Sequence, residues 1–140
     1  MKKYWLIKSE PNEWSWDDQV KEGQSMWDGV RNYQARNNLK KMKIHDYCFF
    51  YHSVNEKSIV GIVEVVKTYY PDPTDKERKF VVVDVKPIKK LNNPVSLKQI
   101  KENKKLQNIA LVKQSRLSVM PIEKKEWDII IKLSNIKMYG

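Results

Sequence analysis

The sequence predicts a mixed α+β domain, in which about five strands have helices inserted between them, or a partly open barrel. Two observations carry this prediction. Several short stretches alternate in polarity or are continuously apolar, which is typical of strands, and segments with helix-capping signals separate them. The length of 140 residues fits one domain with a proper core and is too short for two ordinary domains. We therefore expect a single domain over residues 1–140.

The first third of the chain contains one predicted strand and two predicted helices. Tyr4–Ser9 alternates as a short strand, and Pro11 ends it by forcing the preceding residue into an extended conformation. Ser15 has the character of an N-cap, with an acidic residue three positions later, so a short helix should run to about Glu22. Arg31–Met42 is predicted as a second helix, and lysines near its end suit the helix dipole.

The remaining two thirds of the chain continues the alternation of strands and helices. Asp46–Ser53 is apolar on both faces, which predicts a central strand. The segment Tyr70–Asp75 contains two prolines and is predicted to be a loop. The other predicted elements are strands at Ile59–Tyr69, Phe80–Ile88 and Leu117–Met120, the last ended by Pro121, and helices at Ser96–Asn103, Ile109–Lys113 and Ile122–Leu133.

The charge of the chain favours an anionic partner. Lysine and arginine number 27 against 17 acidic residues, a formal net charge of +10, and nucleic acid is the first candidate for such a surplus. Compositional drift toward lysine, asparagine and isoleucine is the alternative explanation. Arginine is rare by comparison, and two of the four arginines, Arg31 and Arg36, lie close together, which indicates a need for the planar guanidinium.

Other properties of the composition bear on where the protein works. No apolar run of about 18 residues is present, so we expect no membrane span, and the apolar run at the N-terminus is too short for a signal peptide. The single cysteine excludes an internal disulfide and fits a reducing compartment. We expect a soluble cytoplasmic protein that functions as a monomer.

The segment Trp27–Asn38 is the most informative part of the sequence. It combines two large aromatic residues, two arginines and a row of amide side chains, with only Val30 and Ala35 as aliphatic residues. A helix that served only a core would place apolar residues at three- and four-residue spacing. Flat rings beside planar hydrogen-bonding groups instead suit a flat polar ligand such as a nucleobase.

Metal and nucleophilic chemistry find little support. The only soft or imidazole ligands are His45, Cys48 and His52, too few for a zinc site. Cys48 and His52 share one strand face but lie about 13 Å apart, whereas proton transfer requires ~3 Å. We interpret Cys48 as a small core residue and predict no metal, no cofactor and no catalytic residues, so that binding is favoured over catalysis.

Three short clusters carry side chains that a core does not need. They are Lys8–Pro11 and Phe50–Ser53, at the ends of two predicted strands, and Arg116–Ser118, where alternation places Arg116 and Ser118 on one face. Strand ends that bring polar groups together form the mouth of a small barrel, a common ligand position.

With these clusters in view, the sequence resembles the EVE domain, which belongs to the PUA-like superfamily and includes the thymocyte nuclear protein family. The matching segments occur in order along nearly the whole chain, and the two longest are the most specific. They are Trp5–Pro11, Trp27–Asn37, Phe50–Ser53, Gly61–Val65 and Arg116–Pro121.

The resemblance implies a PUA-like pseudobarrel of about five to six strands with short helices inserted between them. It also implies a domain that reads modified bases in nucleic acid, with the pocket where the three clusters and Trp27–Asn38 meet. The resemblance leaves open whether the partner is DNA or RNA and which modification is read.

Within such a pocket each candidate residue has a second interpretation. Trp27 and Tyr33 could stack on an extruded base, although Trp27 could instead be a core residue before a tight turn. Asn32 could read a base edge with its amide or cap the helix that follows. His52 could bond to the base or be a buried imidazole with all its hydrogen bonds made.

The remaining candidates are polar and charged residues near the strand ends. The additional hydrogen-bonding candidates are Ser9, Glu10, Ser53 and Ser118, of which Ser9 and Glu10 could instead serve local capping near Pro11. The phosphate-binding candidates are Lys8, Arg31 and Arg116, which could equally be solvated surface residues. Arg36 is expected to face solvent or to pair with an acid.

Two other functions stay open at this point. The first is an enzyme that acts on a modified base or nucleotide, with Glu10 or His52 as the acid or base. The second is a small-molecule or protein-interaction module on the same fold, which would show no salt-dependent binding of nucleic acid.

Overall fold

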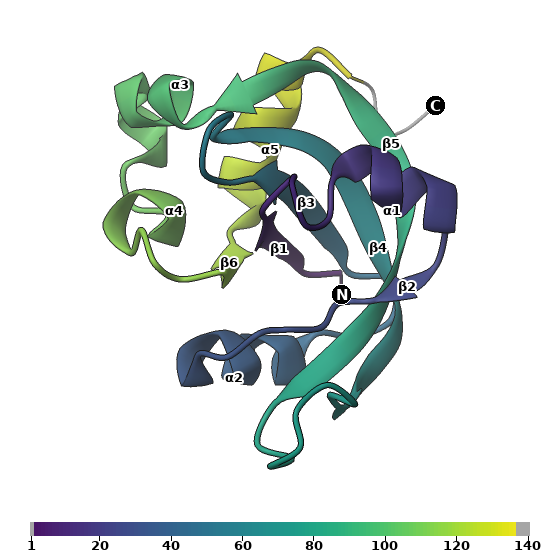
Figure 1. The fold of residues 1–140 in the computed structure, drawn as a ribbon. Helices are drawn as coiled ribbons and strands as arrows, with labels where there is room; N and C mark the ends of the chain where they lie inside the picture. The colour runs from purple at the N-terminus through teal and green to yellow at the C-terminus, as the bar shows by residue number, and fades with distance from the viewer. Residues whose placement is uncertain (1, 137–140) are drawn as a thin grey trace.

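The computed structural model describes residues 2–136 and is built around one six-stranded sheet (Figure 1). The strand order is β2-β5-β4-β3-β1-β6. β1 and β3 pair in parallel and the other neighbours pair antiparallel. The elements are β1 Tyr4–Ser9, α1 Trp16–Glu22, β2 Ser25–Met26, α2 Tyr33–Lys41, β3 Tyr47–His52, β4 Ser58–Pro71, β5 Val81–Ser96, α3 Leu97–Glu102, the 3₁₀ turn η1 Lys104–Leu106, α4 Ala110–Lys113, β6 Val119–Ile122 and α5 Lys124–Ser134.

The sheet is strongly bent, as the predicted barrel-like fold requires. β4 and β5 are the longest strands, and their pairing shifts register at four places, each of which increases the local bend and twist. Figure 1 shows the two strands curving from α3 at one end to a projecting hairpin at the other. The predicted α+β class with helices inserted between strands is confirmed. None of the helices within residues 2–136 has the length and apolarity needed to cross a membrane.

The central strand β3 presents an aromatic ring to each face of the sheet. Phe49 stacks on Trp127 of α5, with ring centroids 3.8 Å apart. Phe50 points to the opposite face, where the edges of Trp16 and Trp27 meet it at 5.4 and 5.3 Å. Since both faces are covered, the prediction of a central strand from its two apolar faces is confirmed.

Cys48 lies on the same strand, fully buried, and burial raises the pKa of its thiol. This confirms the interpretation of Cys48 as a small core residue.

Three predicted boundaries near prolines are wrong, for one shared reason. Pro121 does not end the last strand but lies inside β6, and the last helix begins at Lys124 rather than at Ile122. Likewise β4 continues through Pro71. β6 is an edge strand, and the end of β4 pairs only with β5, so a proline there costs no hydrogen bond on its free side.

The helix α1 packs against the sheet at a glycine of β4. The ring of Trp16 lies directly over Gly61 of β4, so a Cβ added to Gly61 would come within 2.4 Å of the ring. Trp16 is itself only 4% exposed. Because α1 leads into the segment that carries Trp27, this contact helps to fix the position of that segment.

We expect Gly61→Ala to destabilise the fold by about 1–3 kcal/mol, because the new methyl group has to displace a buried indole. Chemical denaturation of the wild type and the variant measures the loss. In a Trp16→Leu background the smaller side chain leaves room, so the same substitution should cost less. An equal cost in both backgrounds would show that the contact with Trp16 is not the cause.

Candidate functional site

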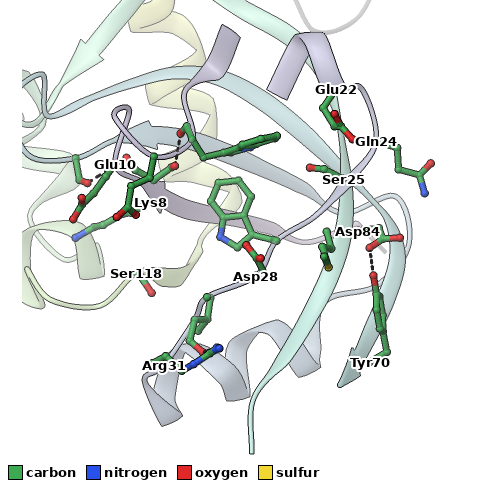
Figure 2. Close-up of a pocket in the computed structure, with 18 of the residues that line it drawn as sticks. Lys8, Glu10, Glu22, Gln24, Ser25, Asp28, Arg31, Tyr70, Asp84 and Ser118 are labelled. Carbon is green, nitrogen blue, oxygen red and sulfur yellow. Dashed lines mark hydrogen bonds between the residues drawn. The ribbon is translucent and has the colours of Figure 1, made fainter. Parts of the chain in front are cut away.

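A cavity of about 1080 Å³ opens beside the carboxyl ends of β1 and β3 (Figure 2). The irregular segment between α1 and α2 forms the longest continuous part of its wall. The end of β1, the approach to β6 and two side chains of the long strands contribute further lining. The lining residues are 8–10, 13, 14, 22, 24–31, 53, 70, 84, 115 and 118.

The cavity brings together most, but not all, of the residues singled out in the sequence. Those that line it are Lys8, Ser9, Glu10, Trp27, Arg31, Ser53 and Ser118. Those outside its lining are Asn32, Tyr33, His52 and Arg116. The three clusters do therefore meet the segment that contains Trp27, as the sequence predicts.

Two indoles contribute to the lining. Trp27 is 6% exposed, its amide donates to the Val83 carbonyl at 2.8 Å, and its ring packs on the core. It is thus a core residue and a cavity residue at once. Trp14, which the sequence analysis did not single out, is half-buried. Its Nε1 donates to Oε1 of Gln19 at 2.9 Å.

Gln19 holds part of this wall in place without lining the cavity. Its side chain is fully buried, and Nε2 donates to the Gly23 carbonyl at 2.7 Å and to Oγ of Ser25 at 3.0 Å. Together with the bond from Trp14, these contacts tie both ends of α1 to the cavity wall. Nothing in the sequence distinguishes Gln19 from a surface glutamine of a short helix, so it was missed.

The ends of β1 and β3 are joined by hydrogen bonds between two serines. The amide and the hydroxyl of Ser53 donate to the Ser9 carbonyl at 2.9 and 3.2 Å. The Ser9 hydroxyl donates to the Trp14 carbonyl. The hydrogens of both hydroxyls are therefore used within the protein, which leaves their lone pairs as acceptors for a ligand.

Lys8 extends from β1 along the cavity toward the segment before β6. Its Nζ donates to the Ser115 carbonyl at 2.8 Å and lies 5.8 Å from the Tyr51 ring. Burial lowers the pKa of Lys8. The ammonium group can offer two further hydrogens to a ligand.

Arg31 is held at the cavity by the buried carboxylate of Asp72. Nη1 of Arg31 pairs with Oδ2 of Asp72 at 3.0 Å, and Nη2 donates to the Thr74 hydroxyl at 2.9 Å. Asp72 also accepts from the Gly29 amide at 3.0 Å and from the Thr74 amide at 2.7 Å. Gly29 has a φ of +79°, a conformation that favours glycine. This network fixes residues 29–31 to the loop after β4.

Desolvation acts to raise the pKa of Asp72, but the hydrogen bonds from Thr74, the Gly29 amide and Arg31 outweigh it. The pKa of this carboxyl therefore lies below its ordinary value. Asp72 thus stays ionised at neutral pH and keeps its pairing with Arg31.

The cavity carries more acidic than basic side chains, although the chain as a whole is strongly basic. Its cations are Lys8 and Arg31, and its carboxylates are Glu10, Glu13, Glu22, Asp28 and Asp84 (Figure 2). Desolvation and the hydrogen bond to Asp84 raise the pKa of Tyr70 to about 12, so its hydroxyl stays protonated and donates to that carboxylate. Such a lining suits an uncharged polar group that can donate hydrogen bonds, with phosphates kept to the rim.

Two predicted base-reading residues are engaged elsewhere. Asn32 is the N-cap of α2, and its Oδ1 accepts from the Ala35 amide at 2.9 Å. Nε2 of His52 accepts from the Trp16 amide at 3.0 Å, while Nδ1 lies 2.9 Å from the carboxylate of Glu56. The interpretations as a helix cap and as a buried imidazole with its bonds made therefore describe these residues, and neither reaches the cavity.

Tyr33 and Arg116 also lie away from the cavity lining. Tyr33 begins α2 and points outward, 54% exposed, with its ring stacked on Phe80. It does not form a second wall opposite Trp27; the second indole of the lining is Trp14 instead. Arg116 is exposed and precedes β6.

The fold and the cavity define a small α+β domain with a candidate binding site at the strand ends of a bent mixed sheet. The model of the EVE domain family matches residues 3–133, so this chain belongs to the EVE domain family. This confirms the resemblance found in the sequence and the pseudobarrel fold that it implies.

Similar proteins come from bacteria and from vertebrates. Thymocyte nuclear protein 1 of Mus musculus is 34% identical in an alignment 169 residues long. The alignment covers 93% of this chain and 73% of that protein. The crystal structure of protein Atu2648 from Agrobacterium tumefaciens superposes with a TM-score of 0.94 at 44% identity, over 98% of this chain and 96% of the other. The structure of human THYN1 in complex with DNA that contains 5-methylcytosine has a TM-score of 0.89 at 32% identity, over 97% and 99% of the two chains.

We expect Asp72→Asn to lower the free energy of unfolding by roughly 1.5–3 kcal/mol at neutral pH, because a buried carboxylate with charge-assisted hydrogen bonds is lost. The folded-state pKa of Asp72 lies below the unfolded value of about 3.9, so its stabilisation is present above that pH and is lost as the pH falls further. Urea denaturation between pH 7 and pH 3 should therefore show the difference between the wild type and the variant shrinking below about pH 4. A difference that stays constant over this range would contradict the role given to the ionised carboxylate.

Proposed function

We propose that this protein binds DNA and takes a modified base, of the 5-methylcytosine type, out of the strand and into the cavity. The observation that carries the proposal is an aromatic and polar cavity in a chain whose human relative was crystallised with DNA containing 5-methylcytosine. A base can enter such a cavity only after leaving its stack, at a cost of a few kcal/mol. The interactions inside the cavity have to offset that cost.

The rings and the hydroxyls of the lining have separate roles in this proposal. Trp14 and Trp27 offer apolar surface to the base, and stacking is worth roughly 1–3 kcal/mol per base. Ser9 and Ser53, whose hydrogens are already used, accept hydrogen bonds from an exocyclic amino group. The carboxylates Glu10 and Asp28 are further acceptors on the same cavity.

A methyl group on the base adds a limited gain. Filling an apolar gap with one methyl-sized group is worth roughly 0.8 kcal/mol, which is about a four-fold preference. Selectivity much above this level requires a competitor that the cavity excludes or a polar modification that it bonds.

The basic residues serve the strand that carries the base. Lys8 and Arg31 lie on the cavity and retain N–H donors beyond those used inside the protein, so they can bind the flanking phosphates. Arg116 is exposed on the approach to β6 and is a third candidate. The formal charge of +10 attracts the DNA backbone over longer range.

The oligomeric state and the location of the protein are also proposals. We propose that the domain functions as a monomer, which rests on the sequence alone. We also propose a cytoplasmic location, which rests on the sequence alone. RNA with the same modified base is the main competing ligand, and the first binding experiment has to include it.

We expect the wild type to bind DNA oligonucleotides with 5-methylcytosine several-fold more tightly than the matched unmodified DNA, because the methyl group fills apolar space in the cavity. Trp14→Leu should weaken binding of the modified strand by about five-fold or more through the loss of stacking. Fluorescence anisotropy with matched DNA and RNA strands, with and without the methyl group, measures both effects.

Tyr69→Leu is the matched control, since Tyr69 is an exposed ring outside the cavity lining. Equal affinity of the wild type for modified and unmodified strands would reject the proposal. A preference for the methylated base that appears only with RNA strands would show that RNA, and not DNA, is the ligand.

A further inference from the structure

A row of stacked side chains lies on the surface next to the cavity. Only the residue at one end of the row lines the cavity. The row consists of Arg31, Phe80, Tyr33 and Arg36, in that order, and we call it the aromatic–arginine row. The guanidinium carbon of Arg31 lies 5.5 Å from the Phe80 ring, the two rings stack at 5.2 Å, and the guanidinium carbon of Arg36 lies 4.8 Å from the Tyr33 ring.

The row is built by two parts of the fold that meet side by side. Tyr33 and Arg36 come from the first turn of α2, and Phe80 immediately precedes β5 in the projecting hairpin (Figure 1). Nη1 of Arg36 donates to the Lys79 carbonyl at 3.1 Å, which joins the helix to the hairpin a second time. The position of the row relative to the cavity is therefore fixed by the fold.

Arg36 carries an unneutralised charge at the far end of the row. The sequence analysis expected it to face solvent or to pair with an acid, and the second expectation is wrong. Within residues 2–136 no carboxylate forms an ion pair with Arg36; its partners are the Lys79 carbonyl and Oδ1 of Asn37. These bonds use three of the five guanidinium N–H donors, which leaves two for a phosphate.

The near end of the row is continuous with the cavity, because Arg31 lines it. Three successive contacts of about 5 Å separate the two guanidinium groups. That path is no longer than about four to five nucleotide steps of ~3.4 Å along a strand. A strand whose base occupies the cavity could thus reach both arginines with phosphates a few nucleotides apart.

We infer that the aromatic–arginine row binds the DNA strand on one side of the flipped base, with Arg31 and Arg36 on its phosphates. Phe80 and Tyr33 hold the two guanidinium groups at a fixed spacing, and Tyr33, 54% exposed, offers its edge to a sugar of the strand between them. The inference rests on the proposed function for the place of the flipped base, but the contact itself does not depend on the modification. It adds to affinity and not to the choice of base, because phosphate contacts carry no sequence information.

The test uses Arg36→Gln, which removes the charge but keeps a polar side chain. Binding of a single-stranded DNA with several nucleotides on each side of one 5-methylcytosine should weaken by about three- to five-fold, the scale of one exposed charge contact. Unmodified DNA should lose the same factor. The slope of log affinity against log salt should fall by about 0.7 for one lost phosphate contact on a single strand.

Two further variants make the test specific. Arg36→Lys keeps the charge and loses the planar stack, so it should restore the salt slope but only part of the affinity. Lys101→Gln on α3 removes one exposed positive charge elsewhere and should change neither quantity by as much. Thermal melting confirms that each variant is folded.

Arg36→Gln behaving like Lys101→Gln in both affinity and salt slope would overturn the inference, whatever the preference for the modified base. Loss of affinity for modified DNA alone would also overturn it, since that result would place Arg36 in base selection. If the proposed function fails, the wild type shows no preference for modified over unmodified DNA. The effect of Arg36→Gln on binding can still be measured in that case.

Discussion

The site depends on one buried carboxylate. Asp72 accepts hydrogen bonds from Gly29, Arg31 and Thr74, and so binds the segment between α1 and α2 to the base of the β4–β5 hairpin. That segment has almost no regular structure of its own, yet it forms the longest continuous part of the cavity wall. The same interaction orients Arg31, which belongs both to the cavity and to the aromatic–arginine row. A single ionised group therefore sets the position of the cavity relative to the aromatic–arginine row.

Features that repeat along the chain or act locally could be predicted from the sequence. The main strands, the capping signal at Ser15 and the central position of β3 follow from periodicity and local chemistry, and the structure has them. The clusters at the ends of β1 and β3 meet because parallel strands bring their carboxyl ends to one edge. The boundaries at Pro71 and Pro121 could not be predicted, because the cost of a proline depends on which neighbour a strand has.

The misplaced site residues share a different cause. Asn32 accepts a hydrogen bond from an amide of α2, and His52 accepts one from an amide of α1. These bonds within the protein engage both side chains. Whether a polar side chain faces a ligand or the backbone is decided by tertiary contacts that spacing does not reveal. Trp14 and Gln19 were missed for the converse reason, since only the packing of α1 brings Trp14 to the cavity and Gln19 beneath its wall.

The position of β1 has a consequence for the order in which the molecule can assemble. β1 is the first strand made, but it lies between β3 and β6, whose residues follow it by some 40 and 115 positions. During synthesis one side of β1 stays open until the residues of β6 have left the ribosome, and contacts this distant in sequence form slowly. The cavity takes lining from the end of β1 and from the approach to β6, so the cavity of a nascent chain is incomplete until β6 docks. The cavity is in this way completed only when β1 has both of its neighbours in the sheet.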